Sequence, residues 1–199
     1  MQNNKMKILF TLIIVSISGY LCYRFSLNVN PNPDRTVGQK LDSLNGVYIY
    51  YNGGIRHTDG RNLTPDGYNL GLKYQCVEFV KRYYYEFYRH KMPDTYGNAK
   101  DFFDATIADG KLNPKRNLLQ FTHPSLSCPK VGDLLIFDGH AGNPYGHVAI
   151  VSAVNKNNIE IIQQNPGPFA SSRVNADLKQ KDGKCEIDHS GILGWLRMK

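Results

Sequence analysis

The sequence predicts an α+β domain with a mostly antiparallel sheet. Helical periodicity is confined to the first part of the domain, whereas short strand-like runs follow one another in the second part. A content of 41% apolar and 12% aromatic residues in a chain of 199 residues is typical of a globular protein with one sizeable core. We therefore expect N-terminal helices packed on a sheet formed by later strands.

The first residues are typical of an export segment. Lys5 and Lys7 precede the apolar run ILFTLIIVSISGYL at 8–21, which has the length of a signal-peptide core. Residues 1–23 are expected to be a cleaved signal peptide or an N-terminal membrane anchor. Either outcome predicts an exported protein in the periplasm or cell envelope, touching a membrane only through residues 8–23 if uncleaved. A cytosolic protein with an apolar start is the alternative.

Residues 24–45 are expected to lead from this segment to a single domain at 46–199. The stretch NVNPNPD at 28–34 is rich in Asn and Pro, which is typical of an extended spacer. The formal net charge is +7, but Lys and Arg are scattered and form no basic stripe. This distribution argues against a nucleic-acid partner and suits an anionic cell envelope.

The strongest helical signal begins at Cys76 and ends before Pro93. Positions i, i+3, i+4, i+7 and i+11 are apolar, and a second face carries charges at i+4 spacing. The apolar face comprises Cys76, Phe79, Val80, Tyr83 and Phe87, and the charged face Glu78, Arg82 and Glu86. The pattern predicts an amphipathic helix.

Shorter signals mark the other elements. A strand is expected at 47–51, a Gly/Asn/Asp-rich loop at 52–75, and a second helix at 98–109 closed by Gly110. A loop follows at 111–131. Strands are then expected at 133–137, 147–154, 159–164 and 192–197.

Four cysteines, Cys22, Cys76, Cys128 and Cys185, are spread along the chain without a CxxC pair. In an oxidising compartment Cys128 and Cys185 can pair, because both are expected in loops, but the connectivity is left open by the sequence. A zinc site would have to combine dispersed residues such as Cys185 and His189 in CEIDH, and we expect no metal.

Cys76 differs from the others because it stands at the head of the predicted helix. Free backbone N–H groups and the positive end of the helix dipole stabilise a thiolate there and lower the pKa of the cysteine. The preceding Lys73, Tyr74 and Gln75 include none of the usual capping side chains, so these donors stay open. They can also hold an oxyanion beside a nucleophile. A small cysteine packed in the core is the alternative that the helix pattern alone favours.

A cysteine nucleophile needs a base, and His147 is the candidate among six histidines. It begins the run HVAIVSAV, whose two strand faces are both largely apolar, so the imidazole is expected at the edge of the core. Gly146 leaves room for a neighbouring side chain. A histidine that only packs in the core is the alternative.

Six stretches together resemble the CHAP family of cysteine- and histidine-dependent amidohydrolases and peptidases. They occur in the family's order over 46–197: YQCVEFVKR at 74–82, YGNAKDFF at 96–103, PKVGDLLIF at 129–137, GHVAIV at 146–151, QQN at 163–165 and ILGWLR at 192–197. Within the family, the chain resembles in particular the amidase domain of glutathionylspermidine synthetase/amidase. The resemblance implies a papain-like cysteine hydrolase fold.

The resemblance also implies roles at the site. Cys76 is expected as the nucleophile and His147 as the general base and later acid. Gln75 is expected to help the Cys76 backbone N–H form the oxyanion hole, with a plain exposed glutamine as the alternative.

The third member of the site departs from the family's pattern. Glutathionylspermidine amidases usually carry Glu-Gln-Asn where this chain has QQN, so Gln163 takes the position of the orienting carboxylate. A neutral amide can accept from the imidazole but stabilises an imidazolium less than a carboxylate does. Asn165 is a second candidate for this role, whereas strand parity turns Glu160 to the opposite face.

These assignments predict an exported cysteine amidase or peptidase that needs no cofactor. Location favours peptidoglycan peptides as substrate, and the resemblance favours a glutathionylspermidine-like amide. A scaffold that binds the cell wall without catalysis is the alternative of another class, and a zinc hydrolase is a third. Asn98 and Asp133 are expected to be structural, as a helix cap and a turn. The loop at 55–75 is expected to select the substrate.

Overall fold

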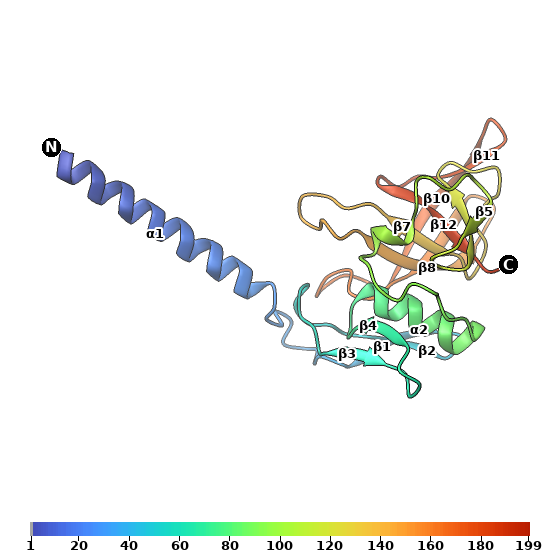
Figure 1. Cartoon of the computed structure of the whole chain (residues 1–199), viewed down its shortest axis with the longest axis horizontal. Helices are drawn as coiled ribbons and strands as arrows, with labels where there is room; N and C mark the ends of the chain where they lie inside the picture. Colours follow the sequence, from blue (N-terminus) through green and yellow to red (C-terminus); the bar gives the residue numbers. More distant parts are fainter. Residues whose placement is uncertain (1) are drawn as a thin grey trace.

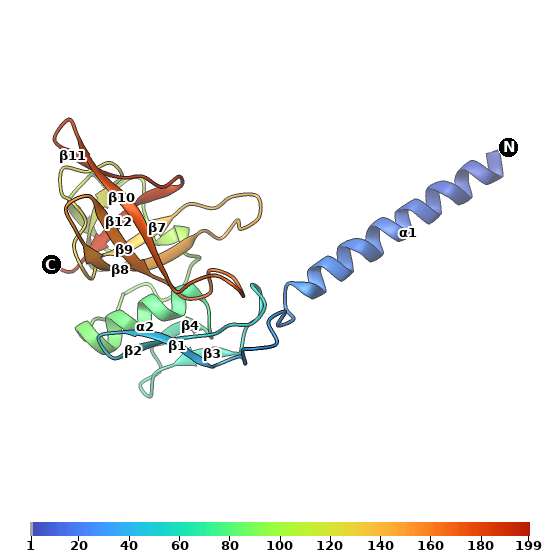
Figure 2. The ribbon, with the colours of Figure 1, turned by 180° about the vertical axis from the view of Figure 1, so that it is seen from behind.

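The structure is a computed structural model that describes residues 2–199. Helix α1 (Gln2–Ser26) projects away from the rest of the chain, as Figures 1 and 2 show from opposite sides. In both views helix α2 (Cys76–Tyr88) lies between a large sheet and the small strands of the first half of the domain. The nucleophile candidate Cys76 is therefore placed at the junction of two layers.

Eight strands form the large sheet in the order β11-β10-β9-β8-β7-β12-β6-β5, and every neighbouring pair is antiparallel. This confirms the prediction of an α+β domain with a mostly antiparallel sheet. The strands are β5 (Lys111–Asn113), β6 (Leu118–Thr122), β7 (Leu134–Phe137), β8 (His147–Val154), β9 (Asn158–Ile162), β10 (Arg173–Lys181), β11 (Lys184–Ile187) and β12 (Ile192–Arg197).

Two small antiparallel pairs of strands precede α2 in the sequence. Strand β1 (Lys40–Leu44) pairs with β2 (Val47–Tyr50), and β3 (Arg61–Leu63) pairs with β4 (Asn69–Leu72). Helix α2 contacts β2 and β4 on one side and β8 on the other. The helix is held on both sides, which fixes the direction in which its first turn points.

The large sheet has an apolar core on each face. Along β8, Val148 and Ile150 pack toward α2, while Ala149 and Val151 pack on the opposite face around Trp195. Alternate side chains of a strand point to opposite faces, so a strand covered on both sides must be apolar throughout. This agrees with the prediction that both faces of 147–154 are apolar.

Helix α1 exposes its apolar side chains all round. Residues Asn4–Ser26 are long and apolar enough to cross a membrane, and none of that segment is buried in the domain. This is compatible with a signal peptide or an anchor.

The chain that follows α1 touches the domain: the Arg56 N–H donates to the Leu27 carbonyl at 2.9 Å and the Tyr51 hydroxyl donates to Asn30 Oδ1 at 2.7 Å. An extended spacer would lack such bonds.

The prediction of a second helix at 98–109 is wrong. Only a 3-10 turn, η1 (Lys100–Phe102), forms there. The carboxylate of Asp101 accepts the N–H of Asn98 at 2.7 Å, and that of Asp104 accepts the N–H of Thr106 at 3.1 Å. Aspartate side chains that take local N–H groups compete with helical hydrogen bonds and favour turns. The N-cap residue of η1 is Ala99, and no side chain caps this turn, so Asn98 is no helix cap, contrary to expectation.

Several strands fall in segments predicted as loops. Strands β3 and β4 lie within 52–75, and β5 and β6 lie within 111–131. Strand β10 is polar along most of its length, so its sequence lacks the apolar alternation that marks a half-buried strand. Its pairing with β9 and β11 is a tertiary feature that local patterns do not report.

Candidate active site

The head of α2 has the open geometry expected from its sequence. Gln75 at the N-cap is extended, with φ −84° and ψ 162°, and its side chain makes no capping hydrogen bond. The first turn of a helix leaves backbone N–H groups unpaired, and here no Ser, Thr, Asp or Asn takes one. Apolar side chains of the same helix, Phe79, Val80 and Tyr83, are fully buried and hold this end against β8.

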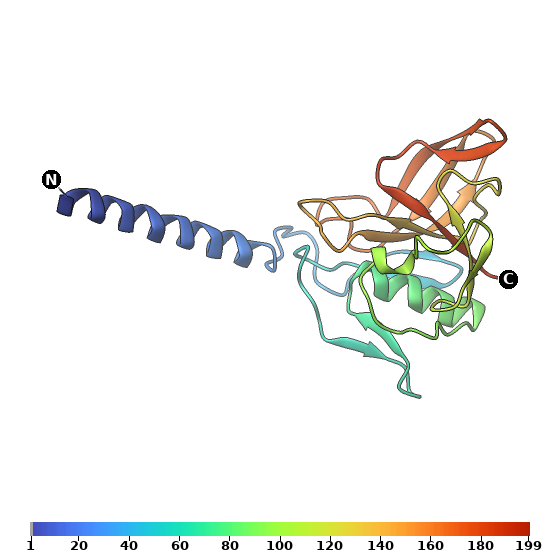
Figure 3. The ribbon, with the colours of Figure 1, turned by 45° about the horizontal axis from the view of Figure 1, so that its top comes forward.

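Cys76 and His147 line the same cleft, which has a volume of about 640 Å³. The lining comes from residues within 55–61, 71–77, 95–99 and 142–147, together with Arg24, Asn28 and Asn165. Figure 3 shows the loop between β7 and β8, which includes 142–146, extending on the side from which α1 leaves. Both predicted catalytic side chains are partly exposed to this cleft. Cys76 also packs against the apolar core that contains Phe79 and Val80.

The direction predicted for the Cys76 pKa is wrong. Burial raises the pKa of the thiol above its usual value, although the backbone N–H groups of Val148 and Val77 act in the opposite direction. Removing a thiolate from water costs more here than the open donors of the helix head return. The cysteine is therefore protonated near neutral pH in the absence of substrate.

The imidazole of His147 is oriented by Gln163. Nε2 of His147 lies 2.9 Å from Oε1 of Gln163, and Nε2 of Gln163 donates to the Ser171 carbonyl at 3.4 Å. The second bond fixes which end of the amide faces the ring, so His147 carries its proton on Nε2 and keeps a lone pair on Nδ1. Burial lowers the pKa of His147 to about 4, although the hydrogen bond to Gln163 acts to raise it. The ring is neutral at neutral pH.

Gln75 and Asn165 connect the loops around the helix head. Gln75 Nε2 donates to the carbonyls of His57 at 2.8 Å and Ile55 at 3.3 Å, and its Oε1 accepts from Asn165 Nδ2 at 2.8 Å. Asn165 Nδ2 also donates to the Ile55 carbonyl at 2.9 Å. Asn165 thus contacts the cleft wall, and Gln163 is the residue that contacts His147.

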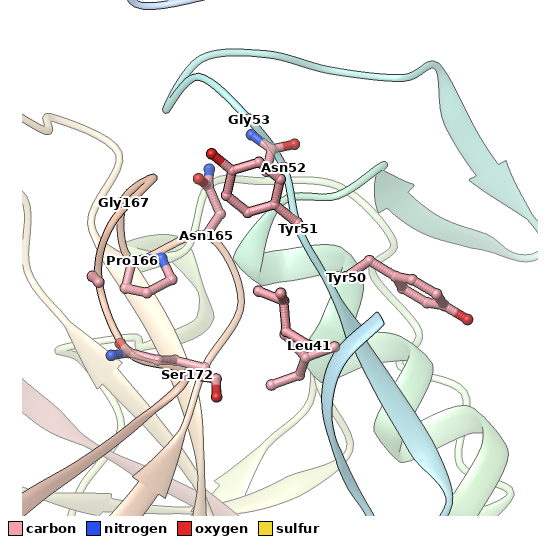
Figure 4. A pocket seen from close by; sticks show the side chains of 12 residues that line it. Leu41, Tyr50, Tyr51, Asn52, Gly53, Asn165, Pro166, Gly167 and Ser172 are labelled. Carbon is pink, nitrogen blue, oxygen red and sulfur yellow. The ribbon is translucent and has the colours of Figure 1, made fainter. Parts of the chain in front are cut away.

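A smaller cavity, about 10 Å³, adjoins Gln163 and Asn165. Figure 4 shows it enclosed by Tyr51 and Asn52 on one side and by Pro166 and Gly167 on the other. That volume is about what one water molecule needs. Gln163 therefore borders a space of about one water molecule, and its bond to the Ser171 carbonyl is what holds the amide beside His147.

A buried polar network that the sequence does not predict lies under the helix head. Arg82 Nε and Glu78 Oε1 are 2.7 Å apart, and both side chains are almost fully buried. Gln164 Nε2 donates to Glu78 Oε2 at 2.9 Å and to the Gln75 carbonyl at 3.0 Å. The network therefore ties the residue after Gln163 to the residue before Cys76. Only the i, i+4 spacing of Glu78 and Arg82 signalled a pair, and nothing in it signalled burial.

The cleft lining does not include Cys128, Asp133, Glu160 or Cys185, which the sequence also singled out. Glu160 forms an ion pair with Arg173 at 2.7 Å, away from the cleft lining. Asp133 accepts the Lys130 N–H at 2.8 Å in a turn and forms an ion pair with Arg197. Cys128 and Cys185 form a disulfide. Among residues 2–199, no group of three His, Cys, Asp or Glu side chains could hold a metal ion.

The chain matches a known protein family. The CHAP domain family matches residues 66–165, half of the chain, and the match includes Cys76, His147 and Gln163. The chain belongs to the CHAP domain family. Within this CHAP domain, the matched segment runs from the loop before β4 to the residues that follow β9.

Two relatives extend this result. The CHAP chain is 31% identical over 147 residues to the bifunctional glutathionylspermidine synthetase/amidase of Escherichia coli (strain K12), and 30% identical over 146 residues to the glutathionylspermidine synthase of Crithidia fasciculata. The alignments cover 68% and 65% of this chain but 23% and 19% of the relatives. The chain thus spans about a fifth of the curated relatives it matches. These matches support a hydrolase or amidase family for the CHAP domain.

One solved structure overlaps loosely with the CHAP chain. The crystal structure of Ly7917 gives a TM-score of 0.33 at 16% identity, over 62% of this chain and 53% of that chain. Family membership rests on the sequence matches.

Proposed function

We propose that this chain is an exported cysteine amidase or peptidase that hydrolyses an amide bond in peptidoglycan peptides. The observation that carries the proposal is the hydrogen bond between Gln163 and His147, whose imidazole lines the same cleft as Cys76. A sulfur at a helix head beside an imidazole on a neighbouring strand is the arrangement of papain-like enzymes, and we propose that fold for residues 46–199.

The proposed reaction proceeds through a thioester. Nδ1 of His147 takes the thiol proton as Cys76 Sγ attacks the amide carbonyl, and the oxyanion accepts hydrogen bonds from backbone N–H groups at the head of α2. The imidazolium then donates that proton to the leaving amine. Water, deprotonated by the same Nδ1, attacks the thioester and releases the acid, and the thiol recovers its proton.

Cys76 and His147 are both neutral before the reaction, and this determines when the proton moves. Because burial raises the pKa of Cys76 and lowers that of His147, proton transfer accompanies attack and does not precede it. Gln163 supports the imidazolium only as a neutral acceptor. Gln75 would assist the oxyanion only if substrate released one of its N–H groups from the Ile55 or His57 carbonyl.

Two features support an exported location. Helix α1 is apolar and exposed, as a signal peptide or membrane anchor would be. The Cys128–Cys185 disulfide suits an oxidising compartment. We propose the periplasm or cell envelope, where an enzyme would meet peptidoglycan peptides.

Glutathionylspermidine is the second candidate substrate, because the relatives' names refer to it. Mass spectrometry of purified muropeptides and of glutathionylspermidine, each incubated with the full chain, separates the two. We expect new amide-cleavage products from muropeptides. Products from glutathionylspermidine alone would favour the second candidate. Binding without cleavage of either would indicate a scaffold, and activity lost to a chelator but spared by alkylation of Cys76 would indicate a metal enzyme.

A further inference from the structure

The cleft that holds Cys76 and His147 is lined by three arginines and no carboxylate. Arg24 lies near the end of α1, Arg56 lies in the segment before β3, and Arg61 begins β3. No Asp or Glu belongs to the lining within the described residues 2–199. Because Cys76 and His147 are neutral, the charge of this cleft comes from the arginines and is positive.

The three guanidinium groups are free of ion pairs in the part of the chain that the structure describes. Its seven ion pairs all involve other cations. Arg61 Nη1 donates to the neutral Asn69 at 3.1 Å, and Arg24 Nη1 donates to the neutral Tyr20 at 3.1 Å. Each of these two groups therefore keeps most of its donors and all of its charge.

Arg56 and Arg61 are placed by contacts that do not use up their charge. The backbone N–H of Arg56 donates to the Leu27 carbonyl at 2.9 Å, which fixes the chain at this point while its side chain lines the cleft. The guanidinium of Arg61 lies over the ring of Tyr96, 5.5 Å from its centroid. Tyr96 also lines the cleft, so this contact places Arg61 at the cleft beside an uncharged neighbour.

Such an arrangement favours an anionic ligand. The guanidinium fork matches a carboxylate, and hydrogen bonds between charged partners are stronger than neutral ones. Positive charges gathered in one cleft repel one another and raise the local concentration of anions. The open N–H groups at the head of α2 add positive character at the reacting end.

We propose that the cleft selects amide substrates that carry carboxylates near the scissile bond, with Arg56 and Arg61 as specificity-determining residues. This inference rests on the proposed hydrolase function, because it names the class of substrate for the same site. An acidic peptide fits, and a polyamine such as the spermidine part of glutathionylspermidine is repelled.

Two synthetic peptides that differ only in charge test the proposal. One is a peptidoglycan stem tetrapeptide with free carboxylates, and the other has every carboxylate replaced by a carboxamide. The full chain with Cys76→Ala, kept in an uncharged detergent, binds each peptide without turning it over, and calorimetry gives the Kd. The same measurement is made after adding Arg56→Gln with Arg61→Gln, or Lys111→Gln, which removes an exposed positive charge outside the cleft.

We expect the acidic peptide to bind roughly tenfold more tightly than the amidated one, as charge-assisted hydrogen bonds allow. The double arginine variant should lose most of this preference, while Lys111→Gln keeps it. Higher salt should also reduce it, because these side chains are open to solvent. Equal binding of the two peptides, failure of both to bind, or a preference that survives loss of both arginines would overturn the inference. Binding with the expected preference but no cleavage by the parent chain would instead overturn the proposed hydrolase.

Discussion

Oε1 of Gln163 accepts a hydrogen bond from Nε2 of His147 at 2.9 Å, and the Ser171 carbonyl holds the other end of the same amide. This relationship fixes the imidazole tautomer with a neutral side chain. An amide can orient the ring as a carboxylate does, but it leaves the ring easier to deprotonate. The activity of this site therefore depends on how much catalysis requires a charge at position 163.

Gln163→Glu should preserve or raise turnover. A carboxylate beside Nε2 favours the imidazolium, so the pKa of His147 should rise and the proton transfer from Cys76 should become easier. Steady-state kinetics of amide hydrolysis measures the change, and Gln163→Ala serves as the variant that cannot accept a hydrogen bond. A Glu variant that is folded but inactive would show that Gln163 is not the orienting residue.

The pH dependence should have an unusually low acidic limb. His147 must be neutral to act as a base, and its pKa lies at about 4, so kcat/KM should rise through that region and level off below neutral pH. Gln163→Glu should move this limb to higher pH, because the folded-state pKa of the imidazole rises. A wild-type limb near the ordinary histidine value of about 6.5 would contradict the burial argument.

Loss of Arg82 should destabilise the domain by about 3–5 kcal/mol, because Glu78 would remain buried without a cation. The double variant Glu78→Leu with Arg82→Leu should lose less than Arg82→Leu alone, since no unpaired charge is left. Urea unfolding monitored by circular dichroism gives both free energies. A double variant less stable than the single one would mean that the hydrogen bonds from Asn62 and Gln164 to Glu78 outweigh the charge.

The disulfide should stabilise the fold without affecting catalysis. Cys128 and Cys185 are 57 residues apart, and closing a loop of that size contributes about 4 kcal/mol in the chain-entropy treatment. Neither cysteine lines the cleft. Unfolding of the full chain with and without reductant should differ by this amount, while the kcat of folded protein stays the same. A kcat that falls on reduction would link the bridge to the site.

The elements that position the site were predictable from the sequence. Strand β8 matches its predicted bounds because it is apolar on both faces, and α2 begins at Cys76 because its apolar face follows the helical period. The positions of His147 and Gln163 follow from those elements and from the order of the family's motifs. The local sequence pattern was sufficient to predict an element where its apolar positions are the buried ones.

Other features depend on tertiary contacts that no local pattern reports. Phe87 shares the apolar face of α2 but is 45% exposed, and Tyr84 is buried instead with its hydroxyl on the Gly132 carbonyl. The pKa of Cys76 was predicted from the helix head alone, but its direction is set by the surroundings that remove the thiol from water. Arg24 reaches the cleft only because the chain after α1 folds back on the loop near Arg56.

Amide hydrolysis by the full chain carrying Cys76→Ala shows whether Cys76 performs the chemistry. Cys22→Ala is the matched control, because Cys22 is the other free cysteine of residues 2–199. We predict that Cys76→Ala reduces kcat by about 10⁴-fold or more, as loss of a nucleophile does in comparable enzymes, while Cys22→Ala keeps the parent rate. Hydrolysis that continues at the parent rate in folded Cys76→Ala would show that Cys76 is not the nucleophile.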